Sequence, residues 1–171
     1  ITSVTYGYIN GAGRYYRGAD FQTGARFLSD NAGDFFVNLS IAYVDDERRS
    51  DTPGDPYVTI MEQERRLRSR SYLSFSWTKN DWAAGVSTSR IGSMNYQSPR
   101  WDGKPNTKID PYYDIGAFVR YDIEDGHYIA LSVSNLMDDI PKKNSDLGWP
   151  WFATYYYSPV GRELFLTYRY T

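Results

Sequence analysis

The chain has 171 residues, enough for one domain with a hydrophobic core, and no cysteine, which excludes disulfides and thiolate metal sites. Its formal net charge of -2 excludes the strongly basic field that is typical of nucleic-acid-binding domains. No stretch reaches the roughly 20 apolar residues of a membrane helix, which excludes a helical membrane protein. A membrane β-barrel is compatible with the composition, because its strands carry polar residues at alternate positions.

Aromatic residues make up 18% of the chain and include 17 tyrosines, and this excess needs a physical reason. Two reasons fit the sequence. The rings either pack at the wet edges of a soluble β protein or lie at the boundary between lipid and water.

Eight segments show the two-residue alternation of side chains that is typical of β-strands. In the first, Val4, Tyr6 and Tyr8 alternate with small or polar residues. The eight predicted strands are residues 1–9, 15–28, 35–43, 73–77, 82–86, 113–123, 127–136 and 162–170. The sequence therefore predicts an all-β fold of antiparallel strands.

Short and long connections alternate between the last seven of these strands. The short ones are residues 29–34, 78–81 and 124–126, and the long ones are residues 45–69, 92–111 and 137–160. Antiparallel neighbours joined in this way place all short turns at one end and all long connections at the other, as outer-membrane barrels do. Residues 61–68 of the first long connection could also form a helix.

Aromatic residues flank each of the three short turns. They are Phe27 and Phe35, Trp77 and Trp82, and Tyr121 and Tyr128. Rings at one level would form the girdle that lies at a membrane interface. The alternative is that these rings simply end the strands of a soluble sandwich, where aromatic residues are common.

Charged residues indicate which side of the predicted sheet could face lipid. Asp114, Arg120 and Asp122 lie on one side of a single strand, and Asp20 lies on the side of its own strand with Gly18 and Gln22. An arginine that faces lipid near the midplane costs about 2–4 kcal/mol, so in a membrane barrel these four charged residues face the lumen. In a soluble barrel the preference reverses, and periodicity alone does not separate the two.

The carboxyl-terminal residues carry a resemblance to a known family. Asn135-Leu136-x-Asp138 closes one predicted strand, and Ser158-Pro-Val-Gly-Arg162 opens a final amphipathic strand that ends in aromatic residues. This arrangement resembles the carboxyl end of TonB-dependent outer-membrane receptors, and Gly18-Ala-Asp20 is similar to the Gly-x-Glu of one of their barrel strands. Such barrels usually finish on Phe or Trp, so we expect an aromatic residue after Thr171.

The resemblance implies a fold, a location and a role. The fold would be a transmembrane β-barrel of 22 strands, of which this chain is the last eight, without the amino-terminal plug. The location would be the outer membrane of a Gram-negative bacterium, among outer-membrane lipid and lipopolysaccharide. Such receptors bind a scarce nutrient, such as a siderophore, cobalamin or a glycan, at extracellular loops and import it with energy from TonB, so the resemblance implies neither an enzyme nor a cofactor.

Two other functions remain open from the sequence. A self-contained eight-stranded outer-membrane barrel could be structural or adhesive, because eight strands can close around a core of side chains. A soluble lipocalin-like barrel could carry a ligand. Pairing of residues 4–9 with residues 164–170 would favour the eight-stranded barrel.

Aromatic and basic residues of the long connections are the candidate substrate-binding residues. They are Tyr96, Arg100, Trp101, Trp149, Trp151, Tyr155 and Tyr156. Exposed rings beside a guanidinium group suit stacking on a sugar, a chelate or a peptide. The alternative is that these rings pack on one another as a lid.

Catalytic and metal-binding residues are not predicted. His127 is the only histidine, which argues against a histidine zinc site or a Ser-His-Asp triad. Four acidic residues could bind calcium through their oxygens: Asp45, Asp46, Glu47 and Asp51. They lack the spacing of an EF-hand, and Arg48 and Arg49 would compete for them, which favours a solvated charged loop.

Overall fold

The computed structural model describes residues 13–61, 66–96, 107–141, 151–152 and 156–170. These residues form an all-β fold with one eight-stranded antiparallel sheet and no α-helix. In the described ranges, no helix is long and apolar enough to cross a membrane.

Seven long strands and one short strand make up the main sheet, in the order β1-β2-β4-β5-β8-β9-β10, with β3 paired to β2. Their bounds are β1 (Gly13–Phe27), β2 (Asp34–Ser50), β3 (Val58–Thr59), β4 (Ser69–Lys79), β5 (Trp82–Ile91), β8 (Tyr112–Asp122), β9 (Tyr128–Ser134) and β10 (Glu163–Arg169). A separate hairpin consists of β6 (Met94–Tyr96) and β7 (Thr107–Ile109), and one turn of 3-10 helix, η1 (Glu124–Gly126), precedes β9. Each long strand thus pairs with the next long strand along the chain.

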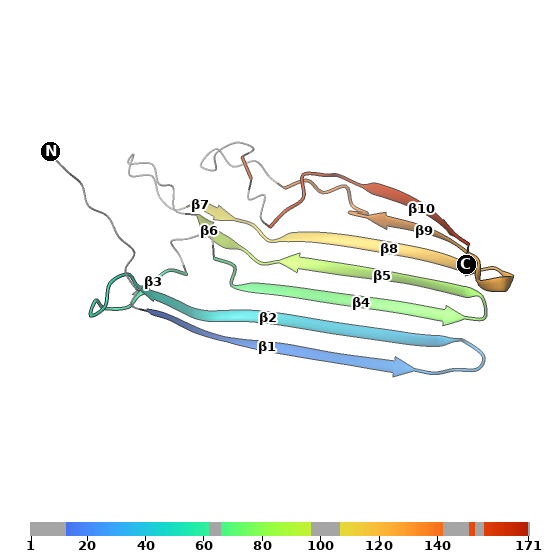
Figure 1. Ribbon diagram of the computed structural model, residues 1–171, viewed down its shortest axis with the longest axis horizontal. Coiled ribbons are helices and arrows are strands. Elements are labelled where there is room, and N and C mark those ends of the chain that lie inside the picture. The colour runs from blue at the N-terminus through green and yellow to red at the C-terminus, as the bar shows by residue number, and fades with distance from the viewer. Residues whose placement is uncertain (1–12, 62–65, 97–106, 142–150, 153–155, 171) are drawn as a thin grey trace.

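The connections alternate as the sequence predicts. Figure 1 shows the turns β1–β2, β4–β5 and β8–β9 together at one end of the sheet. The longer connections β2–β4, β5–β8 and β9–β10 lie at the other end, where the β6–β7 hairpin also lies. We call these the turn end and the loop end.

The strand boundaries correct two expectations and leave a third untested. The predicted first strand, residues 1–9, lies outside the described residues, and the eight strands of the described sheet include the short β3, which was not predicted. The predicted connection at 45–69 begins too early, because β2 continues to Ser50 and pairs with the first residues of β1 across a bulge at Arg17/Gly18. The described part of 61–68 is not helical.

Cross-strand pairing gives the sheet one apolar face, since directly paired residues have side chains on the same side. One row across all seven long strands consists of Phe27, Phe35, Trp77, Ala84, Val119, Leu131 and Leu166. The neighbouring row consists of Ala25, Val37, Phe75, Val86, Ala117, Val133 and Leu164. We call this side the apolar face and the other side the polar face.

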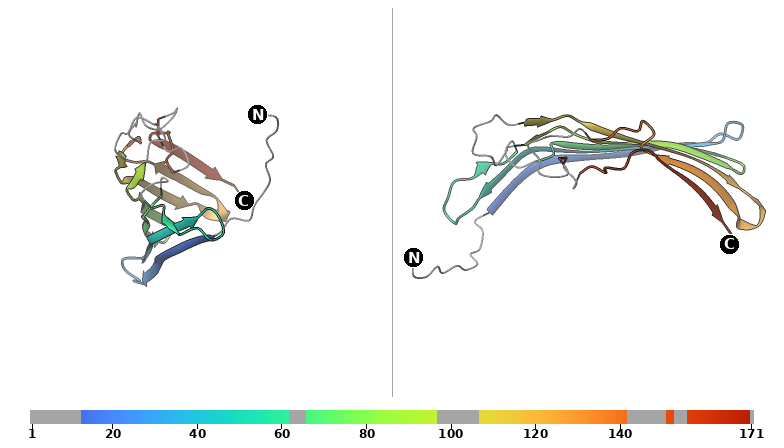
Figure 2. Two further views of the ribbon diagram at one scale, coloured as in Figure 1. Left: turned by 90° about the vertical axis from the view of Figure 1, so that its left-hand side faces the viewer. Right: turned by 90° about the horizontal axis from the view of Figure 1, so that it is seen from above.

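Many large side chains of the apolar face are exposed, while Phe35 and Trp77 are half-buried. Val119, Leu131 and Leu166, which are adjacent across three strands, are 37%, 49% and 77% exposed. They therefore do not form a closed, dry interior. The edges of the sheet are also open, because β1 and β10 do not pair with each other in the described residues, and Figure 2 shows the sheet as a curved, open surface.

The rings that flank the short turns follow this division with one exception. Phe27, Phe35 and Trp77 are neighbours in one row, and Trp82 packs on Tyr121 with ring centroids 4.8 Å apart. Tyr128 differs, because it pairs with Asp122 and therefore lies on the polar face. Five of the six predicted rings thus share the apolar face at the turn end.

Candidate functional site

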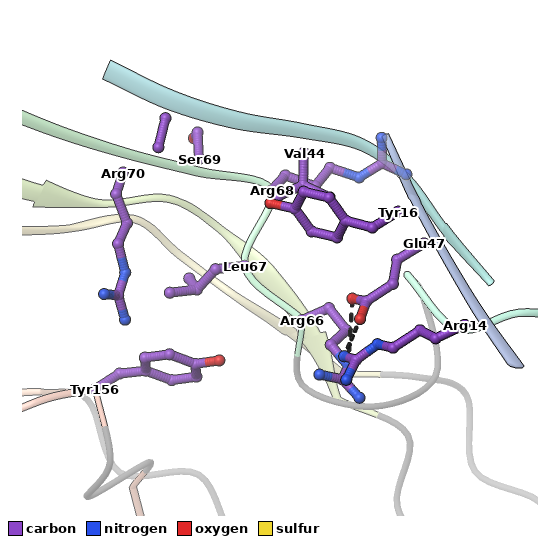
Figure 3. A pocket seen from close by; sticks show the side chains of 11 residues that line it. Arg14, Tyr16, Val44, Glu47, Arg66, Leu67, Arg68, Ser69, Arg70 and Tyr156 are labelled. Atoms are coloured by element: carbon purple, nitrogen blue, oxygen red, sulfur yellow. Dashed lines mark hydrogen bonds and ion pairs between the residues drawn. The ribbon is translucent and has the colours of Figure 1, made fainter. Parts of the chain in front are cut away.

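A pocket on the polar face at the loop end is the best-defined candidate site. It begins with an alternation in the sequence, Arg66, Arg68 and Arg70, in the segment that leads into β4. All three line one cavity of about 280 Å³, together with Leu67 and Ser69 between them. Figure 3 shows them with residues from β1, β2 and the β9–β10 connection.

Glu47 is the charged centre of this pocket. It is only 4% exposed, and it forms an ion pair with Arg14 of β1. Its other carboxylate oxygen lies 3.6 Å from Nε of Arg66. A buried carboxylate is costly unless cations accompany it, so the two guanidinium groups stabilise Glu47 here.

Arg70 forms the opposite wall of the pocket. Its guanidinium carbon lies 5.4 Å from the centre of the Tyr156 ring, a cation–π distance. Both residues also line an adjoining cavity of about 550 Å³, to which Tyr72 and Ser89 contribute. Arg70 and Tyr156 therefore line two neighbouring cavities on the polar face.

A small hydrophobic cluster holds Tyr156 over the sheet. Met94 and Tyr157 are 2% and 6% exposed, and Tyr156 packs against them. The Tyr157 ring meets the Tyr112 ring edge to face, with centroids 5.3 Å apart. The third long connection is thus anchored on β8 and on the β6–β7 hairpin beside the pocket.

The residues that carry the family resemblance join β9 to β10. Asn135 is 5% exposed, and its side chain donates to Asp139 O at 2.8 Å and accepts from Asp139 N at 2.9 Å. Asp138 Oδ1 accepts from Arg162 N at 2.7 Å, and a Cβ on Gly161 would meet this oxygen at 2.6 Å. The spacing of these polar residues therefore fixes the start of the last strand.

For two of the seven predicted substrate-binding residues, Trp151 and Tyr156, the structure describes both the backbone and the side chain. Tyr156 lies in the pocket, and Trp151 is 43% exposed, outside the residues that line it. The backbone of Tyr96 belongs to β6. Arg100, Trp101, Trp149 and Tyr155 lie outside the described residues.

The four charged residues that we expected to share one side all lie on the polar face. Asp20 and Asp114 belong to that face through the pairing of β1, β2, β4, β5 and β8. Asp114 Oδ1 accepts from Asn135 N at 3.1 Å. Arg120 and Asp122 form an ion pair of 2.9 Å at the turn end.

The acidic group that we considered for calcium is occupied by arginines. Asp45 pairs with Arg17, Asp46 with Arg48 and Asp51 with Arg49, while Glu47 lies in the pocket. In the part of the chain that the structure describes, no group of three metal-ligating side chains is found. The expectation of a solvated loop was wrong for Asp45, Asp46 and Glu47, which lie within β2.

The pocket is not apparent from the sequence, because its residues come from separate strands and connections. Arg14, Glu47 and Arg70 are brought together by the pairing of β1 with β2 and of β2 with β4. Three arginines at alternate positions were visible in the sequence, but Arg66 and Arg68 precede β4, so this spacing does not mark a strand.

Comparison with known proteins adds no assignment. No protein-family model, no curated protein and no solved structure matches this chain.

Proposed function

We propose that this chain is part of the wall of a TonB-dependent outer-membrane receptor, namely the last eight strands of a 22-stranded transmembrane β-barrel. The receptor would bind a scarce nutrient on its extracellular side and import it with energy derived from TonB. One observation carries the proposal: the exposed apolar face that crosses seven strands.

The energetic argument compares lipid with water on the apolar face. A soluble protein rarely exposes apolar patches larger than a few hundred Å². Here Leu131, Leu164 and Leu166 are 49%, 70% and 77% exposed on one face. In a bilayer these side chains would contact acyl chains, and the charged residues of the polar face would contact the water-filled lumen.

The two ends of the sheet support an orientation. In outer-membrane barrels the short turns are periplasmic and the long loops extracellular. The turn end would then lie at the periplasmic interface, where the rings of Trp82 and Tyr121 would form part of the girdle. The pocket at the loop end would open toward the extracellular side, where the nutrient arrives.

The open edges support a larger assembly. In the described residues, β1 and β10 have no strand on their outer sides. Unpaired backbone groups are costly within lipid, so the edges would pair with the earlier strands of the receptor. The partners of this chain would be those strands, the plug, outer-membrane lipid and lipopolysaccharide, with TonB acting through the plug.

Site-directed fluorescence tests the membrane assignment. The chain has no cysteine, so Leu131→Cys and Ala130→Cys give single labelling sites on opposite faces of β9. In the complete protein in lipid vesicles, with any cysteine elsewhere replaced, we expect doxyl lipids to quench a bimane label at 131 and to leave one at 130 bright. Equal quenching at both sites, or a protein that stays in solution without detergent, would contradict the proposal.

A cross-link separates the receptor from the eight-stranded barrel. A disulfide between Val4→Cys and Leu166→Cys would form only where residues 4–9 pair with β10. We expect no such disulfide in the receptor. The transport role is tested by nutrient uptake in cells, which should stop when the proton-motive force is collapsed.

A further inference from the structure

We infer that the pocket at the loop end binds an acidic organic ligand that carries at least two carboxylate or phosphate groups on an aromatic or apolar body. The inference rests on the proposed function and deepens it, because it names the chemical class of the ligand. It distinguishes an acidic ligand from a neutral glycan.

Arg70 is the first group in the pocket that could bind an anion. Its partner among the described residues is the Tyr156 ring, and no carboxylate of these residues lies within ion-pair distance. The guanidinium group has five N–H donors in a planar fork that matches a carboxylate or phosphate. Since Arg70 lines both adjoining cavities, an anionic group could reach it from either space.

Arg14 supplies a second anchoring point across the pocket. It bonds to Glu47 through one terminal nitrogen, and its side chain is 54% exposed. One bond leaves most of its donors available to a ligand. Glu47 fixes the guanidinium group in place and so lowers the entropy that binding would cost.

The neighbouring arginines of the same end show that this arrangement is specific to the pocket. Arg17 forms an ion pair with Asp45, and Arg48 forms one with Asp46 at 2.7 Å, so each of these two cations has its own carboxylate. Among the described residues of the pocket lining, the one carboxylate is that of Glu47, which pairs with Arg14 and Arg66 and not with Arg70. Arg70 and the remaining donors of Arg14 therefore give an anion a favourable field in the pocket.

The remaining walls indicate an organic body instead of a bare inorganic anion. Tyr16, Leu67 and Tyr156 add ring and aliphatic surface to the lining of the pocket (Figure 3). The larger cavity, about 550 Å³, falls within the size range of small-molecule sites, and the smaller one, about 280 Å³, lies just below its lower limit. A planar ring with acidic substituents could stack on tyrosine while its anionic groups reach Arg70 and Arg14.

Calorimetric titration with a defined probe tests the inference. The probe is benzene-1,3,5-tricarboxylate, and its neutral triamide is the matched control ligand. With the complete receptor in detergent, we expect the tricarboxylate to bind, its affinity to fall with added salt, and the triamide not to bind. Arg70→Gln should weaken binding by about tenfold or more, because a hydrogen bond to a charged group is lost.

Arg120→Gln is the matched protein control, because Arg120 is an arginine of the same face at the turn end. The Arg120→Gln variant should bind the tricarboxylate with the same affinity as the unchanged protein. Arg70→Lys keeps the charge without the fork and should weaken binding less than Arg70→Gln does. Absence of tricarboxylate binding, equal loss in Arg120→Gln, or equally tight binding of the triamide would overturn the inference.

Lipid quenching at Leu131→Cys, measured on the same preparations, separates the two proposals. Quenching together with absent tricarboxylate binding would refute only the acidic ligand. Absent quenching would refute the membrane receptor whatever the pocket binds. The same measurement in the Arg70→Gln background shows whether that variant is folded.

Discussion

The two faces of the sheet obey different rules. On the apolar face, rows of Val, Leu, Phe and Ala run across seven strands, and no charged residue interrupts the two central rows. On the polar face, individual residues have individual partners, such as Glu47 with Arg14 and Arg120 with Asp122. The apolar face thus requires only that its side chains be apolar, whereas the polar face requires particular residues at particular positions.

This difference reflects what each kind of interaction requires. Transfer of apolar surface out of water is non-directional and roughly proportional to area, so one apolar side chain can replace another at small cost. Ion pairs and hydrogen bonds need a partner in a fixed place, and a lost partner leaves the other group unsatisfied. Substitutions that move a residue between these two classes test the comparison most strongly.

The largest effect is expected from a charge on the apolar face. Leu131→Arg should lower the free energy of unfolding by about 2–4 kcal/mol, because the guanidinium group would face lipid near mid-strand. Guanidinium chloride unfolding of the complete protein in liposomes, followed by tryptophan fluorescence, measures this loss.

The neighbouring position provides the control for that change. Ser132→Arg places the same side chain on the polar face and should change the free energy of unfolding by less than about 1 kcal/mol. Equal losses of unfolding free energy for the two variants would mean that both faces meet the same solvent, which would contradict the assignment of one face to lipid and the other to water.

A second effect is expected where the polar face buries a charge. Glu47→Gln removes the carboxylate that Arg14 and Arg66 share, so the free energy of unfolding should fall by about 1–3 kcal/mol. The partial exposure of Arg14 places the loss below that of a fully buried pair. Unfolding measured at low and high salt should show the loss at both. A loss that vanishes in salt would place Glu47 in open solvent.

A third effect concerns close contact on the polar face. A Cβ on Gly85 would lie 2.6 Å from the Phe118 ring and 3.0 Å from Phe75 O, so Gly85→Ala should destabilise by about 1 kcal/mol. Gly116→Ala is the matched control, because its Cβ would meet neighbours only at 3.4 Å. That change should be neutral or stabilising through the unfolded chain. Thermal unfolding should therefore show a loss of stability for Gly85→Ala and no loss for Gly116→Ala.

Periodicity predicted the strands well because apolar and polar side chains alternate with the pleat. The apolar residues of β2 and β8 were predicted from the sequence, and so was the alternation of short and long connections. The predicted end of β2 near Tyr43 was wrong, because residues up to Ser50 are charged and still pair with β1. Backbone pairing across a bulge depends on the partner strand, which local composition does not encode.

The candidate site was less predictable than the strands. Tyr156 was singled out from composition, but its contact with Arg70 depends on how the third long connection packs on Met94 and Tyr112. Glu47 was assigned to a solvated loop, and its burial follows from the extension of β2 beside β1. Sites assembled from several strands require the register, which a single sequence gives only where the alternation is regular.

The smallest effect is expected at the exposed ion pair of the polar face. Arg120 and Asp122 are 43% and 41% exposed at their side chains, so water already solvates both charges. Asp122→Asn should therefore lower the free energy of unfolding by no more than about 1 kcal/mol, and added salt should reduce the difference further. Unfolding of this variant beside Glu47→Gln compares an exposed and a buried carboxylate on one face. A loss at Asp122 as large as that at Glu47 would mean that the turn end of the polar face is shielded from water, and the lumen-facing assignment of Arg120 would need a partner that covers it.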